Sequence, residues 1–132
     1  MIDCNIYEGV YGKTLRIETQ GIEELNSILE LFIQFKTVEK KKQRAISSLG
    51  DIKLTGFHEL ILQKSNQKHF ISLYNEMTFK DTAKGLVYTW LISDEECARC
   101  EGLIKALLES GKAGHQYLLL NERLIIEIAY NE

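Results

Sequence analysis

The sequence predicts an α+β fold: a single domain in which two main helices pack on an antiparallel or mixed sheet of about six to seven strands. The chain has 132 residues, which is the size of one domain spanning residues 1–132. Several short stretches alternate apolar and polar residues, as half-buried strands do, and two longer stretches follow the period of a helix. Two helices layered on one sheet bury both kinds of apolar surface.

The first third of the chain predicts a β-hairpin followed by a helix. Residues 2–7 and 14–18 alternate apolar and polar side chains, and the turn cluster 9–12 between them contains two glycines. Over 22–35 the apolar residues recur on one side of a helix. Glu23 and Glu24 lie in its first turn, where the helix dipole favours negative charge.

The middle of the chain has weaker local patterns than its two ends. Residues 37–56 include a solvated charged run, and 45–54 fits either a short strand or an irregular crossing. We expect strands over 57–63 and 69–74, with a turn at 65–67 and a polar loop through Lys84. Residues 86–92 are apolar on both faces, which favours a central strand covered on both sides or nearly so.

The last third predicts a helix and two strands. Ser93 and Glu96 have the spacing of a capping box, which begins a helix that runs to about Ser110. Gly111 suits the left-handed residue that ends such a helix. Strands are expected over 115–120 and 123–130, joined by a tight hairpin at 121–122.

Composition excludes several classes of protein. The chain is 45% hydrophobic and 27% charged, as ordinary globular proteins are, so disordered and collagen-like classes are excluded. No apolar stretch approaches the ~18 residues of a membrane span. The first residues show no signal-peptide pattern, and three cysteines fit a reducing compartment. We therefore expect a cytoplasmic protein without a membrane segment.

The charge is unevenly distributed. Residues 36–44 carry five basic side chains against one acidic side chain, whereas the net charge of the whole chain is −3, so the remaining residues carry −7. An acidic body repels phosphate, which argues against direct nucleic-acid binding. The same charge attracts a basic protein partner, although it also simply keeps a small domain in solution.

The sequence offers weak candidates for catalysis or metal binding. Cys97 and Cys100 have the C-x-x-C spacing of redox and metal sites, but both fall on the apolar side of the second helix, which favours core packing. A zinc site needs two further ligands at suitable spacing. The histidines His58, His69 and His115 belong to no recognisable nucleophile–base arrangement. We expect no catalytic residue, no cofactor and no metal.

One polar cluster stands out where a loop enters a predicted strand. His115, Gln116 and Tyr117 are three consecutive hydrogen-bonding side chains. Buried polar groups need partners, so these residues predict a fixed polar network. We interpret that network as structural, with the lining of a site as the alternative.

The C-terminal half resembles a known group of proteins. Four features carry the resemblance: Tyr88-x-Trp90, Ser93-x-Glu95-Glu96, the run 114–118, and the end of the chain over 129–132. Over residues 86–132 the chain resembles bacterial immunity proteins of polymorphic-toxin and contact-dependent growth inhibition systems. The resemblance implies a cytoplasmic, non-catalytic protein that binds and blocks the C-terminal domain of one cognate toxin, in several systems a nuclease.

An inhibitor of a basic nuclease needs negative charge for fast encounter and exposed aromatic side chains as anchors. The candidates for toxin binding are Tyr7 and Tyr11 around the first hairpin, and Glu95, Glu101 and Glu109 on the second helix. Two alternatives stay open. One is a small structural or adaptor protein that self-associates through an open sheet edge, which would make a dimer. The other is a C-x-x-C redox protein.

Overall fold

The structure of the protein is a computed structural model that describes residues 1–37, 42–65 and 76–132. These residues form nine strands, two α-helices and one 3-10 turn. In chain order they are β1 (Ile2–Gly9), β2 (Gly12–Thr19), α1 (Gly21–Lys36), β3 (Gln43–Ala45), the 3-10 turn (Ile46–Leu49), β4 (Ile52–Thr55), β5 (Glu59–Lys64), β6 (Met77–Thr82), β7 (Gly85–Ile92), α2 (Asp94–Ser110), β8 (Gly114–Leu119) and β9 (Ile125–Tyr130).

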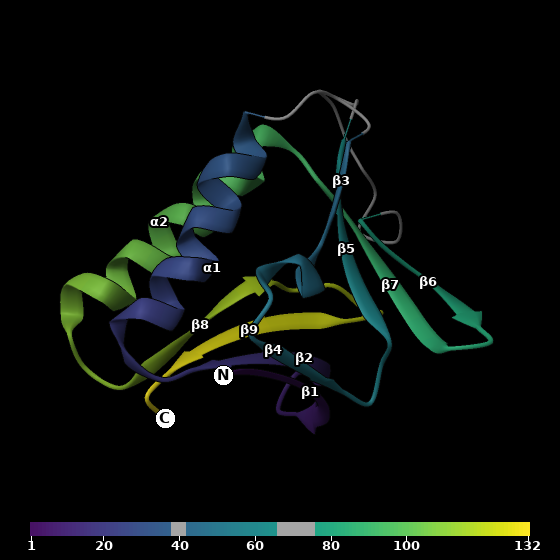
Figure 1. The fold of residues 1–132 in the computed structure, drawn as a ribbon, viewed down its shortest axis with the longest axis horizontal. Helices are drawn as coiled ribbons and strands as arrows, with labels where there is room; N and C mark the ends of the chain where they lie inside the picture. Colours follow the sequence, from purple (N-terminus) through teal and green to yellow (C-terminus); the bar gives the residue numbers. More distant parts are fainter. Residues whose placement is uncertain (38–41, 66–75) are drawn as a thin grey trace.

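The strands form two mixed sheets, where the sequence predicted one sheet of six to seven strands. Sheet A has the order β4-β1-β2-β9-β8, and sheet B has the order β3-β5-β7-β6. Figure 1 shows sheet A below the helices and sheet B rising at the other side of the molecule. The α+β class and the two helices agree with the prediction, and of its two alternatives, an antiparallel or a mixed sheet, both sheets are mixed. The division into two sheets depends on long-range pairing that local periodicity does not encode.

The centre of sheet A joins the two ends of the chain. β2 pairs with β9 in parallel, with Arg16 opposite Glu127, although the two strands are at opposite ends of the sequence. The antiparallel β1–β2 hairpin extends the sheet on one side, and β8 pairs antiparallel with β9 on the other. This arrangement brings residues from the first and last fifths of the chain onto one surface.

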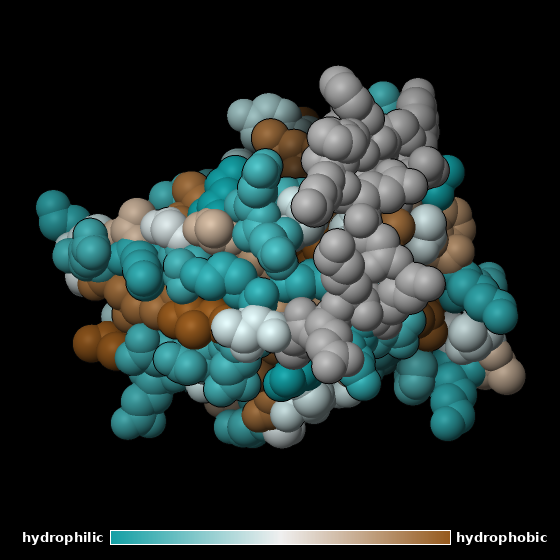
Figure 2. Space-filling model, turned by 90° about the horizontal axis from the view of Figure 1, so that it is seen from above, coloured by the Kyte–Doolittle hydropathy of each residue, from teal (hydrophilic) through white to brown (hydrophobic). Residues whose placement is uncertain are grey.

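Both helices lie on the same side of sheet A, next to each other (Figure 1). Their apolar sides complete a core with the inner faces of both sheets, where Phe32 of α1 contacts Trp90 of β7 at 5.9 Å between ring centroids. Seen from above, the surface carries many hydrophilic residues with hydrophobic ones between them (Figure 2). Ile22, predicted as part of the apolar side of the first helix, is exposed at the start of α1.

The limits of α2 follow the sequence prediction. Ser93 and Glu96 form the capping box, and Gly111 has the left-handed conformation with φ of 65°. Lys64, which is almost completely buried, contacts both helices. Its ammonium group donates to the carbonyls of Phe35 (3.0 Å) and Lys36 (2.9 Å) at the end of α1, and it pairs with Asp94 at the start of α2.

Several local predictions need correction. The predicted polar loop that ends at Lys84 contains strand β6. The region 45–54, for which a short strand and an irregular crossing were both open, contains the 3-10 turn and the start of β4. β8 and β9 end and begin at Leu119 and Ile125, so their connection is longer than a hairpin at 121–122. β7 is a central strand of sheet B, as predicted, and is buried on the side of Trp90 and partly buried on the other. The predicted strand 69–74 and most of the turn 65–67 lie outside the described residues.

In the described ranges no helix has the length and apolar character needed to cross a membrane.

Candidate functional site

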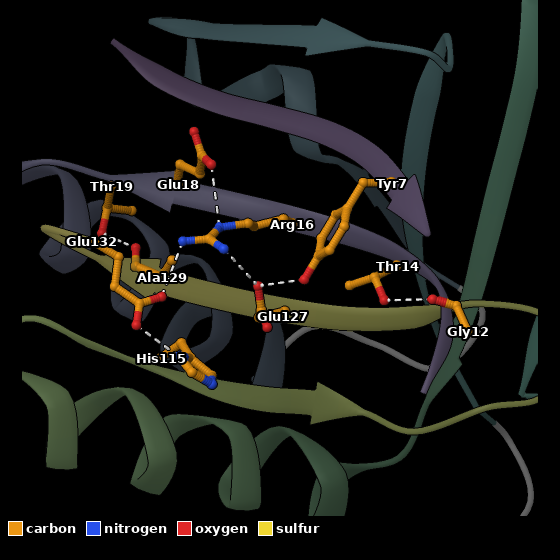
Figure 3. A network of polar contacts seen from close by, with 10 residues as sticks. All are labelled: Tyr7, Gly12, Thr14, Arg16, Glu18, Thr19, His115, Glu127, Ala129 and Glu132. Carbon is orange, nitrogen blue, oxygen red and sulfur yellow. Dashed lines mark hydrogen bonds and ion pairs between the residues drawn. The ribbon is translucent and has the colours of Figure 1, made fainter. Parts of the chain in front are cut away.

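The side of sheet A that faces away from the helices carries a polar and aromatic surface. Side chains alternate between the two faces of a strand. Leu15 and Ile17 of β2 and Ile126 of β9 point into the core, so the neighbouring residues on each strand point outward. We call this surface the tyrosine–glutamate face, and Figure 3 shows much of it. It comprises Tyr7, Tyr11, Arg16, Glu18, His115, Tyr117, Glu127 and Glu132.

Glu127 lies at the centre of this face. The residue is only 2% exposed. One carboxylate oxygen accepts a hydrogen bond from the Tyr7 hydroxyl at 3.2 Å and lies 3.4 Å from a guanidinium nitrogen of Arg16 (Figure 3). Burial, and then the negative charge of Glu127, raise the pKa of both Tyr7 and Tyr117 above the ordinary value. Both phenols therefore stay protonated and can donate to the carboxylate.

Arg16 connects Glu127 to two other carboxylates. Its guanidinium nitrogens lie 3.2 Å from Glu18 and 3.0 Å from Glu132. The contact to Glu18 is an ion pair without hydrogen-bond alignment, since the Nε atom of Arg16 has no hydrogen-bond partner among the described residues. Arg16 carries one positive charge and the three glutamates carry three negative charges. These four residues therefore have a net charge of −2, before His115 is counted.

Aromatic rings form one border of the face. Tyr117 makes edge-to-face contacts with Tyr11 (5.5 Å between centroids) and His115 (5.6 Å). The His115 Nδ1 atom lies 2.8 Å from the second carboxylate oxygen of Glu132. Tyr11 is 67% exposed and follows Val10, which is 91% exposed at the tip of the β1–β2 hairpin. The border therefore offers apolar and aromatic surface beside a buried negative charge.

This arrangement suits binding of a cationic surface. Carboxylates outnumber the positive group that holds them, and aromatic rings next to them provide contact area and cation–π sites. Because Arg16 and the two phenols fix Glu127 in place, the face is ordered before a partner arrives, which lowers the entropy cost of binding. In the parts of the chain that the structure describes, no group of three or more His, Cys, Asp or Glu side chains is arranged to hold a metal ion.

The five predicted toxin-binding residues fall into separate places. Tyr7 and Tyr11 belong to the tyrosine–glutamate face. Glu95 and Glu109 are exposed on α2. Glu101 is largely covered. Its carboxylate is paired with Lys36 of α1 (3.4 Å) and with Lys105 of α2 (3.9 Å), so its charge is already neutralised within the chain. The structure therefore places the two tyrosines on the same face of sheet A, apart from the glutamates of α2.

The predicted network of His115, Gln116 and Tyr117 is divided by strand alternation. His115 and Tyr117 lie on the outer face of β8, where they contact each other, while Gln116 points to the opposite side. The partners of the two outward residues include Glu132, Glu127 and Tyr11. The cluster is thus part of a larger surface.

Sequence reasoning missed Arg16, Glu18, Glu127 and Glu132 as site residues. One local signal pointed to Glu127, because it is the single charged residue within the apolar run 124–129. A charge in the middle of a strand that is otherwise buried needs a partner. The identity of that partner depends on the β2–β9 pairing, which only the fold supplies.

The three cysteines are buried and free, as the packing interpretation of Cys97 and Cys100 predicted. Burial raises the pKa of Cys97 to about 11 and that of Cys100 to about 12. The Cys100 thiol lies 3.6 Å from the Leu118 carbonyl, to which it donates. Protonated, enclosed thiols are poor nucleophiles, so this geometry disfavours a redox role.

Comparison with protein-family models, with curated proteins and with solved structures gives no match for this chain.

Proposed function

We propose that this chain is a non-catalytic immunity protein that binds and neutralises a cognate toxin domain, and that the tyrosine–glutamate face is its contact surface. The observation that carries the proposal is the buried Glu127 carboxylate, held by Tyr7 and Arg16 on a sheet face that no described helix covers. The C-terminal resemblance to immunity proteins supports the same function.

The charge of the surface indicates the kind of toxin. The tyrosine–glutamate face carries excess negative charge, and the whole chain is acidic. Nucleases that act on DNA or RNA present positive surfaces to phosphate groups. An acidic face with tyrosine anchors is complementary to such a surface, which supports a nuclease as the target.

The central experiment is co-expression with the toxin domain encoded beside this protein. The intact chain is expected to protect cells and to co-purify with the toxin in a one-to-one complex of nanomolar or tighter affinity, about −12 kcal/mol. If the toxin still kills these cells and the two proteins do not co-purify, the immunity function is wrong and the adaptor alternative replaces it.

A matched pair of variants locates the contact surface. Tyr11→Ala removes an exposed aromatic ring from the tyrosine–glutamate face, and Phe79→Ala removes an exposed ring from sheet B. Tyr11→Ala is expected to weaken toxin binding at least tenfold, as loss of an aromatic anchor does, while Phe79→Ala leaves affinity unchanged. Equal effects of the two changes would place the interface elsewhere.

The redox alternative has its own test. The double variant Cys97→Ser/Cys100→Ser puts hydroxyls into an apolar site, which costs about 1–3 kcal/mol of stability for each unpaired group. If the protein is an immunity protein, a folded double variant still protects cells. Loss of protection by a stably folded double variant would favour the redox protein.

A further inference from the structure

Strand β6 is the longest sheet edge without a register shift among the described residues. The other edge of sheet B is β3, with three residues, and one edge of sheet A is β4, with four residues. The second edge of sheet A, β8, also has six residues, but a register shift between Tyr117 and Leu119 interrupts its pairing with β9, and such irregularities disfavour edge-to-edge pairing. β6 has six residues, and Phe79 in its middle is 57% exposed.

The direction of the backbone groups of β6 follows from its pairing with β7. The Leu91 N–H donates to the Glu76 carbonyl at 2.8 Å, which makes Glu76 and Leu91 a hydrogen-bonded pair of the antiparallel ladder. Every second residue from Glu76 onward therefore faces β7. The N–H and C=O groups of Met77, Phe79 and Asp81 face away from the sheet, and the Met77 carbonyl indeed accepts from the Arg123 side chain at 3.3 Å.

We propose that two copies of this chain form a dimer by antiparallel pairing of their β6 strands, with Phe79 on the twofold axis. Antiparallel pairing between identical strands places one residue opposite itself, since opposing side chains share a face of the sheet. With Phe79 on the axis, the outward N–H and C=O groups of Phe79 and Asp81 and the Met77 N–H find partners. The Met77 carbonyl then accepts a second hydrogen bond beside the one from Arg123. This proposal goes beyond the toxin-binding function and does not depend on it.

Side-chain chemistry favours this register over the one centred on Lys80. Lys80 on the axis would oppose the partner's Lys80, and directly opposed like charges are destabilising. With Phe79 on the axis, the two exposed rings meet, each already in contact with Tyr88 of its own chain at 6.2 Å. Asp81 then lies opposite the partner's Met77, beside the Arg123 side chain that contacts Met77. The twofold axis repeats this contact, so the dimer interface gains two pairs of opposite charge, each formed by Asp81 of one copy and Arg123 of the other.

Sedimentation velocity of the full chain tests association. The fraction of dimer is expected to rise as concentration increases from micromolar to millimolar, and Phe79→Pro is expected to abolish it. Proline removes only an outward N–H at this position, so the β6–β7 ladder and the circular dichroism spectrum are retained.

A charge swap tests the ion pairs of the interface. Asp81→Arg is expected to raise the dissociation constant of the dimer about tenfold, and the double variant Asp81→Arg/Arg123→Asp is expected to restore it. Tyr11→Ala, on sheet A, is the control.

Cysteine crosslinking tests the register. Thr78 lies opposite the partner's Lys80 with about 4.5 Å between Cα atoms, within the range of a disulfide. A mixture of Thr78→Cys and Lys80→Cys proteins is therefore expected to form the mixed disulfide under mild oxidation, while neither protein forms it efficiently alone. The native cysteines are buried and do not compete. A monomer at millimolar concentration, or efficient crosslinking of Thr78→Cys or Lys80→Cys alone, overturns the proposal.

Discussion

The Tyr7 hydroxyl lies 3.2 Å from a carboxylate oxygen of Glu127, although the two residues are 120 positions apart in the chain. The contact spans three neighbouring strands, because β2 lies between β1 and β9. Arg16 of β2 contacts the same oxygen at 3.4 Å. A hydroxyl, a guanidinium group and a carboxylate from three strands therefore meet at one point, which fixes the register of the centre of sheet A.

Removal of Arg16 is expected to destabilise the protein more than joint removal of Arg16 and Glu127. Arg16→Met leaves the buried Glu127 carboxylate without its positive partner, at a cost of about 2–4 kcal/mol in the free energy of unfolding. Arg16→Met/Glu127→Leu removes both charges and is expected to recover part of this loss. Urea unfolding of the single and double variants measures the coupling. Additive effects would mean that the ion pair is energetically unimportant.

Alkaline pH is expected to weaken the fold through the buried thiols. Burial raises the pKa of Cys4 and Cys100 to about 12 and that of Cys97 to about 11, from an ordinary 9.0. The folded state holds each proton more tightly, so this stabilisation is complete below pH 9 and is lost as pH rises toward the folded-state values. Each thiol contributes a slope of up to about 1.4 kcal/mol per pH unit.

Urea unfolding under reducing conditions between pH 8 and pH 11 measures this slope. The variant Cys97→Ala/Cys100→Ala is expected to show a shallower decline in the free energy of unfolding than the unmodified chain. Tyr7 and Tyr117, whose pKa values are also raised, remain in both proteins and cancel in the comparison. An identical decline in both proteins would contradict the assignment to the thiols.

Lys64 is expected to be more important for stability than its exposed partner Asp94. Lys64→Met removes hydrogen bonds to two carbonyls at the end of α1, which leaves buried acceptors unsatisfied at about 1–3 kcal/mol. The Asp94 side chain is 69% exposed, so water replaces its contact in Asp94→Asn and the change is expected to be small. Thermal unfolding of both variants compares them. A larger effect for Asp94→Asn would mean that the ion pair dominates.

Association with a basic toxin domain is expected to slow as salt concentration rises. Attraction between unlike charges is screened over about 10 Å at 0.1 M salt, so the association rate constant falls while the dissociation rate constant changes little. Stopped-flow mixing with the toxin domain measures both. Glu18→Gln on the tyrosine–glutamate face is expected to reduce the salt dependence, whereas Glu109→Gln on α2 is expected to leave it unchanged. The reverse pattern would place the toxin on the helix.

Local sequence determined the elements whose signals lie within a few residues. The capping box of Ser93 and Glu96 and the left-handed Gly111 define α2, because both act through neighbouring backbone groups. The burial of Cys97 and Cys100 followed from helical spacing for the same reason. β6 was missed because Thr78, Lys80 and Asp81 are polar, and an edge strand with exposed faces lacks the apolar alternation that marks a half-buried strand.

The pairing of strands was decided by tertiary structure. Alternation of apolar and polar residues predicted that Arg16 and Glu127 lie on strands, but not that β2 and β9 are neighbours, since parallel pairing of distant segments leaves no local pattern. The same limit concealed the division into two sheets and the assembly of the tyrosine–glutamate face. Alternation fixes which side of a strand a residue occupies. Only the burial of apolar surface by the whole chain selects which strands stand side by side, and therefore which side chains meet.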